Sequence, residues 1–133
     1  MNLKPVTVSD YDTLKTFFVD QPYNLSIYSP ASLIAWSNQL FQAYYAAVDG
    51  VLFIACEAKK NPQDSHLILP VSRSGSCTPA DLHRYARQFG FEHYWYVPGD
   101  YLGTLDHSEL EALFVCKEQK EFNDYVYLTE DLI

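Results

Sequence analysis

The sequence predicts an α/β (α+β) domain in which helices flank a mixed sheet. Segments with apolar residues at helical spacing alternate with short strand-like segments along all 133 residues. Two of these strand-like segments flank an Asp49-Gly50 pair, the strongest short-range signal of a β-hairpin. The hydrophobic fraction of 48% and the charged fraction of 20% are typical of a globular protein. The length suits a single domain spanning residues 1–133.

A short strand and two helices are predicted first. Residues 4–8 are the strand candidate, and Ser9 is the expected N-cap of the first helix, with Asp12 as its capping-box partner. Ser29 and Pro30 mark the start of the second helix, because proline favours the first helical position. The expected apolar side of this second helix consists of Leu33, Ile34, Ser37, Leu40 and Phe41.

A three-stranded meander is predicted next. Residues 42–48 and 51–58 flank the Asp49-Gly50 turn, and residues 66–71 form a dense apolar third strand after a polar loop. A two-residue turn fixes the register of the hairpin. The predicted cross-strand pairs are Val48 with Val51, Ala46 with Phe53, and Tyr44 with Ala55.

A third helix begins at Thr78-Pro79, where Asp81 completes a capping box, and it ends at Gly90. Its expected buried face consists of Leu82, Tyr85, Ala86 and Phe89. An aromatic strand over residues 93–97 follows, so the connection between the strands at 66–71 and 93–97 is a crossover through this helix.

The end of the chain is predicted to form a short helix, a strand and the start of another helix. Asp106 and Glu109 frame the short helix, and residues 125–128 alternate as a strand does. Thr129 is a good N-cap, and two acidic residues follow it where a first helical turn favours them. The sequence ends inside this helix, so we expect the chain to be the front part of a longer protein.

This order of elements resembles the GNAT acyltransferase fold, and several segments resemble one family more closely. The chain is similar to the N-terminal half of bacterial proteins related to the C-terminal domain of phosphatidylglycerol lysyltransferase. The resemblance covers nearly the whole chain. The segments that carry it are Gln-Pro-Tyr (21–23), Ala-Trp-Ser-Asn (35–38), Tyr-Tyr-Ala-Ala-Val-Asp-Gly (44–50), Leu-Ile-Leu-Pro-Val-Ser (67–72), Tyr-Trp-Tyr-Val-Pro (94–98) and Asp-Tyr-Val-Tyr-Leu-Thr-Glu-Asp-Leu (124–132).

The resemblance implies two GNAT-like halves joined in tandem. It also implies transfer of an aminoacyl group from charged tRNA to a lipid or to another amine or hydroxyl acceptor. The family's substrate-handling residues lie mostly in the second half. We therefore expect a non-catalytic half that packs on its partner half to form a cleft, with tRNA a partner of the full-length protein only. The isolated chain is expected to self-associate through an exposed aromatic face.

The best local signal for a ligand is the sequence Arg73-Ser74-Gly75-Ser76, before the third helix. The GNAT resemblance implies that backbone N–H groups at this junction hold the pyrophosphate of acyl-CoA, with help from the helix dipole. Arg84 and Arg87 lie three residues apart and share a side of that helix. The alternative function is therefore a free-standing N-acyltransferase that uses acyl-CoA.

Other features favour a solvated loop at this junction. Gly75 is the only glycine there, so the usual Gly-rich pattern of an acyl-CoA site is not met, and Pro79 removes one backbone donor. The GNAT resemblance also raises a tyrosine as general acid, with Tyr44, Tyr45, Tyr94 and Tyr96 as candidates. Alternation places Tyr94 and Tyr96 on one face of their strand. Structural roles for these rings compete with that role, and no catalytic set is identified.

Charge and composition exclude several classes of partner. The net charge of −8 repels phosphate backbones and anionic lipid, which argues against DNA and membrane surfaces. No apolar run is long enough for a transmembrane helix, and no signal-peptide core is present, so a cytoplasmic protein is expected. Cys56, Cys77 and Cys116 are expected to be reduced. Cys77, before a helix start, favours a thiolate, and no metal-ligand spacing occurs.

Overall fold

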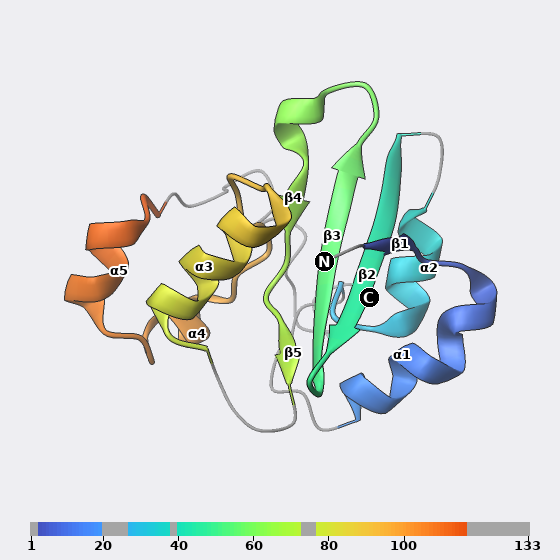
Figure 1. The fold of residues 1–133 in the computed structure, drawn as a ribbon, viewed down its shortest axis with the longest axis horizontal. Coiled ribbons are helices and arrows are strands. Elements are labelled where there is room, and N and C mark those ends of the chain that lie inside the picture. The colour runs from blue at the N-terminus through green and yellow to red at the C-terminus, as the bar shows by residue number, and fades with distance from the viewer. Residues whose placement is uncertain (1–2, 20–26, 38–39, 73–76, 117–133) are drawn as a thin grey trace, which may run out of the picture.

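The computed structural model describes residues 3–19, 27–37, 40–72 and 77–116 (Figure 1). Within these ranges a five-stranded antiparallel sheet is flanked by helices, which confirms the α+β class. The sheet contains β1 (Lys4–Pro5), β2 (Phe41–Val48), β3 (Val51–Ala58) and β4 (His66–Leu67) in that order, and β5 (Val71–Ser72) also pairs with β3. The predicted strand at 125–128 and the helix from Thr129 lie outside the described residues.

The first helix begins differently from the prediction. Thr7, not Ser9, is the N-cap, and it precedes a 3₁₀ turn, η1 (Val8–Asp10), that runs into α1 (Tyr11–Phe18). The carboxylate of Asp10 accepts hydrogen bonds from the Thr7 backbone N–H at 2.8 Å and from the Thr7 hydroxyl at 2.9 Å. The chain therefore turns at Thr7, and the first strand stops at Pro5 instead of residue 8.

The second helix, α2 (Pro30–Trp36), starts as predicted and ends early. The Ser29 hydroxyl oxygen accepts a hydrogen bond from the backbone N–H of Ser32 at 3.1 Å. Ser37 has an extended backbone and closes the helix. Leu40 and Phe41 were expected on the helix, but Phe41 instead begins β2, and its ring lies 5.7 Å from that of Trp36.

The β2–β3 hairpin has the predicted register. Val48 pairs with Val51, next to a turn whose two residues both have positive φ, 53° at Asp49 and 79° at Gly50. Such a turn matches the right-handed twist of the two strands, which is why Asp-Gly favours it. The register continues without interruption to the pairing of Phe41 with Ala58.

Alternate residues of β3 face two different layers of helices. Leu52 and Ile54 belong to one core with Leu14 of α1 and Leu33 of α2. Phe53 instead packs on α3 (Pro79–Phe89), with its ring 4.7 Å from Tyr85 and 5.1 Å from Phe89. The helices α1 and α2 thus lie on one side of the sheet and α3 on the other (Figure 1).

The third helix agrees with the prediction at both ends. The Thr78 hydroxyl oxygen accepts a hydrogen bond from the Asp81 N–H at 3.2 Å, and Gly90 ends the helix in the left-handed conformation with φ 79°. Leu82 and Ala86 are buried as expected, whereas Tyr85 and Phe89 are half-buried.

Two short helices follow, of which only the second was predicted. Pro98 and Gly99 follow the strand predicted at 93–97, and the chain turns directly there into the one-turn helix α4 (Gly99–Leu102). The predicted short helix is α5 (His107–Leu113), whose N-cap Asp106 accepts a hydrogen bond from the Glu109 N–H at 3.0 Å.

The predicted strand at 66–71 is interrupted by a β-bulge. Leu67 pairs with Ala55 and Val71 pairs with Leu52, so three residues, 68–70, oppose only two on β3. Such an extra residue bends a strand and interrupts its ladder of hydrogen bonds. Pro70 has no N–H to donate, so the interruption suits the sequence.

Residues 93–95 lie parallel to β4, across the crossover through α3. The Leu67 N–H donates to the His93 carbonyl, and the Trp95 N–H donates to the Leu67 carbonyl, each at 2.9 Å. The strand predicted over 93–97 is cut short because Tyr96 has a positive φ of 57°.

Candidate functional site

The hydroxyl of Tyr28 lies where the chain at 93–97 parts from β4. It accepts a hydrogen bond from the Leu69 N–H at 3.1 Å and donates one to the Tyr96 carbonyl at 2.9 Å. The bulge explains this arrangement, because Leu69 lies among the residues out of step with β3. The side chain of Tyr28 is buried and takes the place of a direct hydrogen bond between the two segments.

Tyr94 and Tyr96 do not share a face, contrary to the prediction. The Tyr94 hydroxyl donates to the Leu82 carbonyl on α3 at 2.6 Å. The Tyr96 ring instead contacts the rings of Trp36 and His66, with centroid distances of 5.9 Å and 5.8 Å. Regular alternation fails because the left-handed backbone at Tyr96 turns its side chain to the other side.

A groove of about 650 Å³ runs beside residues 94–97, between α3, α4 and α5. This volume lies in the range of small-molecule and peptide-anchor pockets. Within the described residues its walls are mostly apolar, and its ionisable side chains are those of Glu92, His93, Tyr94, Tyr96 and Cys116. The lining consists of Leu69, Leu82, Glu92, His93, Tyr94, Trp95, Tyr96, Val97, Leu102, Leu105, Leu110, Leu113, Phe114, Val115 and Cys116.

The tyrosines around the groove hold their protons firmly. Burial raises the pKa of Tyr94 and raises that of Tyr96 to about 12. Burial likewise raises the pKa of Tyr101 to about 12, and its hydroxyl donates to the Cys77 carbonyl at 3.1 Å. The Tyr94 proton is already engaged by Leu82, so its delivery to a substrate as a general acid would require that hydrogen bond to break.

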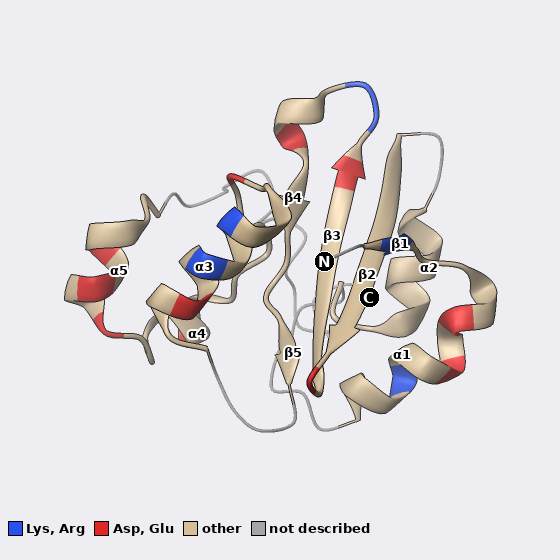
Figure 2. Cartoon of the chain, in the orientation of Figure 1, with Lys and Arg blue, Asp and Glu red and all other residues tan. Residues whose placement is uncertain are grey.

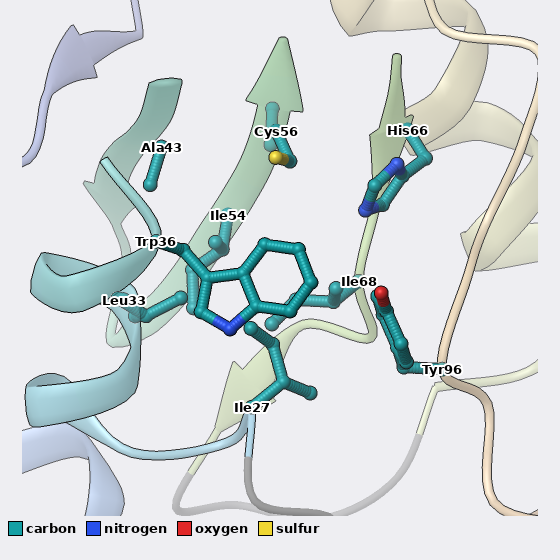
Figure 3. A pocket seen from close by; sticks show the side chains of 10 residues that line it. Ile27, Leu33, Trp36, Ala43, Ile54, Cys56, His66, Ile68 and Tyr96 are labelled. Atoms are coloured by element: carbon teal, nitrogen blue, oxygen red, sulfur yellow. The ribbon is translucent and has the colours of Figure 1, made fainter. Parts of the chain in front are cut away.

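A second, much smaller cavity lies inside the molecule, between α2 and the sheet (Figure 3). Cys56, His66 and Tyr96 turn their side chains toward it, and Trp36 lies across it (Figure 3). Its volume is about 10 Å³, comparable to a single water probe. A thiol and an imidazole therefore lie close together, in a space too small for a substrate.

Both groups are electrically neutral near pH 7. His66 is 1% exposed, and burial lowers its pKa to about 4. Its ring stacks on Trp95 at 4.2 Å, and its Nδ1 lies 2.9 Å from the Asp64 carbonyl. Burial raises the pKa of Cys56 to about 11. The pair therefore lacks the thiolate that nucleophilic catalysis requires.

Cys77 is also a poor nucleophile, which corrects the prediction for its position. A thiolate was expected there because the residue precedes the start of α3. The side chain is half-buried, and this burial raises the pKa of the thiol, with the nearby Asp81 carboxylate acting in the same direction. Desolvation of the charged form outweighs the favourable helix end.

The first turn of α3 uses its backbone donors within the chain. The Asp81 N–H donates to the Thr78 hydroxyl, and the Ala80 N–H donates to the Glu109 carboxylate of α5 at 3.0 Å. Pro79 has no donor. A carboxylate of the protein thus occupies the kind of position that a phosphate takes at a helix start.

The predicted anion-site residues are only partly visible. Arg73, Ser74, Gly75 and Ser76 lie outside the described residues. Arg84 forms an ion pair with Asp81 at 3.0 Å, and its guanidinium lies over the Tyr85 ring. Arg87 is exposed on α3. The acyl-CoA site at these six residues remains a prediction.

Sequence reasoning missed the residues that organise this region. Tyr28 gave no signal beyond its place before the N-cap Ser29, because its two partners are distant in sequence. Glu109 was noted only as an acid of a short helix, although its carboxylate joins α5 to α3. His66 is the first residue of the predicted strand at 66–71, and nothing in the sequence indicates its stack on Trp95.

The described part of the chain has neither a candidate metal site nor a candidate membrane-spanning helix. No group of three or more His, Cys, Asp or Glu side chains there could hold a metal ion. None of the helices in the same ranges combines the length and the apolar character needed to cross a membrane.

No family model matches the chain, and no curated protein or solved structure gives a significant match.

Proposed function

We propose that this chain is a non-catalytic, GNAT-like half of an aminoacyl- or acyltransferase-like protein, and that it packs on a second half to form a cleft. The groove beside residues 94–97 is the surface that would receive the partner. One observation carries the proposal: a groove of about 650 Å³ with mostly apolar walls lies beside residues 94–97. Apolar grooves of this size commonly receive the side chains of a partner.

The side chains of Cys56 and His66 in the inner cavity and of Tyr94 in the groove support a binding role over a catalytic one. The thiol of Cys56 is protonated near neutral pH, and the imidazole of His66 is uncharged and buried. The hydroxyl of Tyr94 is hydrogen-bonded within the chain. Catalytic groups normally have pKa values near the working pH and lie within reach of a substrate, and these three do not meet both conditions.

Calorimetry with acetyl-CoA tests the proposal against the alternative of a free-standing N-acyltransferase. We expect neither heat of binding nor a shift in Tm at millimolar acetyl-CoA. The start of α3 supports this expectation, because Glu109 and Thr78 already accept hydrogen bonds from its backbone donors. Binding that weakens in an Arg73→Ala variant, or turnover of acetyl-CoA by the chain alone, would overturn the proposal.

A further inference from the structure

The stretch of chain that forms most of the groove is rich in acidic residues, which indicates the charge that a partner would carry. Between Gln88 and Cys116 the sequence has no Lys or Arg, and this stretch is bounded by Arg87 and Lys117. The same stretch supplies α4, α5 and most of the lining of the groove. Its acidic residues are Glu92, Asp100, Asp106, Glu109 and Glu111.

These carboxylates differ in how far they are already engaged. Glu92 lines the groove itself. Glu109 accepts the hydrogen bond from Ala80, and Asp106 caps α5, so both are held within the chain. Glu111 is exposed on α5, about 100° around the helix from the lining residue Leu110, so it flanks the groove and does not line it. In Figure 2 the ribbon of α5 carries acidic positions and no basic ones.

The nearest described cations lie on α3. Arg84 is paired with Asp81 at 3.0 Å, which reduces its effect on the groove. Arg87 lies one turn beyond His83, whose ring contacts Phe114 of the lining at 6.0 Å. One exposed arginine at one wall leaves the region acidic, because α4, α5 and the segment between them have no Lys or Arg.

We propose that the groove binds an amphipathic helix whose apolar side fills it and whose flanks carry Lys and Arg. This inference rests on the proposed function, since it names the chemistry of the segment that the groove receives. Anchoring by apolar side chains at helical spacing is a common mode of recognition. The acidic surroundings add complementary charge, which raises the association rate and disfavours acidic partners.

Two synthetic peptides test the charge preference on the full chain. One is a helical peptide of Leu and Lys of about 14 residues, and the other replaces each Lys with Glu. Fluorescence anisotropy of the labelled peptides gives the affinities. We expect the Leu/Lys peptide to bind at least about tenfold more tightly, which corresponds to about 1.4 kcal/mol. Its affinity should fall as salt is raised, because exposed charges are screened.

Matched variants locate the binding. Leu113→Asp places a charge in the lining and should weaken Leu/Lys binding by about tenfold or more. Leu40→Asp alters a half-exposed leucine outside the groove and should leave binding unchanged. Glu111→Lys should weaken binding of the Leu/Lys peptide and strengthen that of the Leu/Glu peptide, whereas Glu57→Lys on β3 should do neither. The Glu111 pair does not alter the core, so the test survives if Leu113→Asp fails to fold.

Equal affinity for the two peptides, tighter binding of the Leu/Glu peptide, or absence of binding would each overturn this inference. An unchanged affinity in both Leu113→Asp and Glu111→Lys would do the same, because binding would then lie elsewhere. The proposed function fails by a different result, namely turnover of acetyl-CoA by the chain. The two failures are therefore distinguishable.

Discussion

Two regions of the sheet are determined by different kinds of interaction. One is the β2–β3 hairpin, and the other is the edge formed by β4, β5 and residues 93–97. The hairpin is a continuous ladder, set by a turn of two residues with positive φ. The edge is interrupted by a bulge, and the hydroxyl of Tyr28 fills the gap between its segments. Local turn chemistry determines the first region, whereas contacts between residues far apart in sequence determine the second.

The largest expected effect comes from removing a core side chain of the hairpin. Leu52 is 0% exposed and joins the strand to the core beneath α1 and α2. Leu52→Ala should lower the free energy of unfolding by about 2–5 kcal/mol, through lost burial and a residual cavity. Urea denaturation followed by circular dichroism measures this. Val8→Ala, at a residue that is 75% exposed, serves as the control and should change stability by less than about 0.5 kcal/mol.

The second prediction concerns the effect of low pH on stability through His66, which lies in β4 at the edge region. Burial lowers the pKa of His66 to about 4, so the unfolded chain, in which histidine has a pKa near 6.5, binds more protons between these values. The contribution of this group to stability is complete above about pH 6.5 and is lost as the pH falls toward 4. The upper bound of the loss is about 3 kcal/mol.

Denaturation curves at several pH values, compared with those of His66→Phe, measure this loss. The variant keeps an aromatic ring against Trp95 and should lose less stability over that window. The carboxyls of Asp10 and Asp81, whose pKa values are lowered by hydrogen bonds from backbone N–H groups, act only below it. The same pH dependence in both proteins would contradict the role of His66.

Removal of the Tyr28 hydroxyl tests the contact that joins the two segments of this edge. Tyr28→Phe keeps the ring but removes the hydrogen bonds of the hydroxyl with the Leu69 N–H and the Tyr96 carbonyl. The free energy of unfolding should fall by about 1–3 kcal/mol, the cost of losing buried hydrogen bonds. Hydrogen exchange should accelerate at Leu69 more than at Ile54 of the hairpin. Equal acceleration at both amides would show that the two regions respond as one.

The smallest effect concerns the turn of the hairpin. Gly50 has φ 79°, and a Cβ there would meet nothing within 4 Å, so Gly50→Ala introduces backbone strain without a clash. Stability should fall by about 1–2 kcal/mol. Gly99 has equally open space and no positive φ. Gly99→Ala should therefore be neutral or slightly stabilising, and thermal melts of the two variants separate strain from volume.

The sequence predicted those parts of the fold that depend on near neighbours. The hairpin register, the N-cap at Ser29 and both ends of α3 follow from residues within a few positions of each other. Predictions failed where two local signals competed. Thr7 and Asp10 formed the capping box in place of Ser9 and Asp12, and the chain past Trp36 left the helix because Phe41 pairs with Ala58 in the sheet.

The candidate site was less predictable because distant residues form it. The positive φ of Tyr96 and the bulge at residues 68–70 together turn side chains that simple alternation places otherwise. The contact of Glu109 with Ala80 joins segments 29 residues apart, and no spacing rule indicates it. The acidic character of the region after Gln88 was present in the sequence, but only the groove gives it a meaning.

The described edges of the sheet also bear on aggregation. At one edge β1 has only two residues, and one of them, Pro5, has no backbone N–H. On the other side of β3, β5 has only two residues, and the bulge before it includes Pro70 and interrupts the ladder. Short, bent and proline-containing edges are poor templates for a strand from another molecule. We therefore expect strand pairing between copies of this protein to be disfavoured at β1 and at β5.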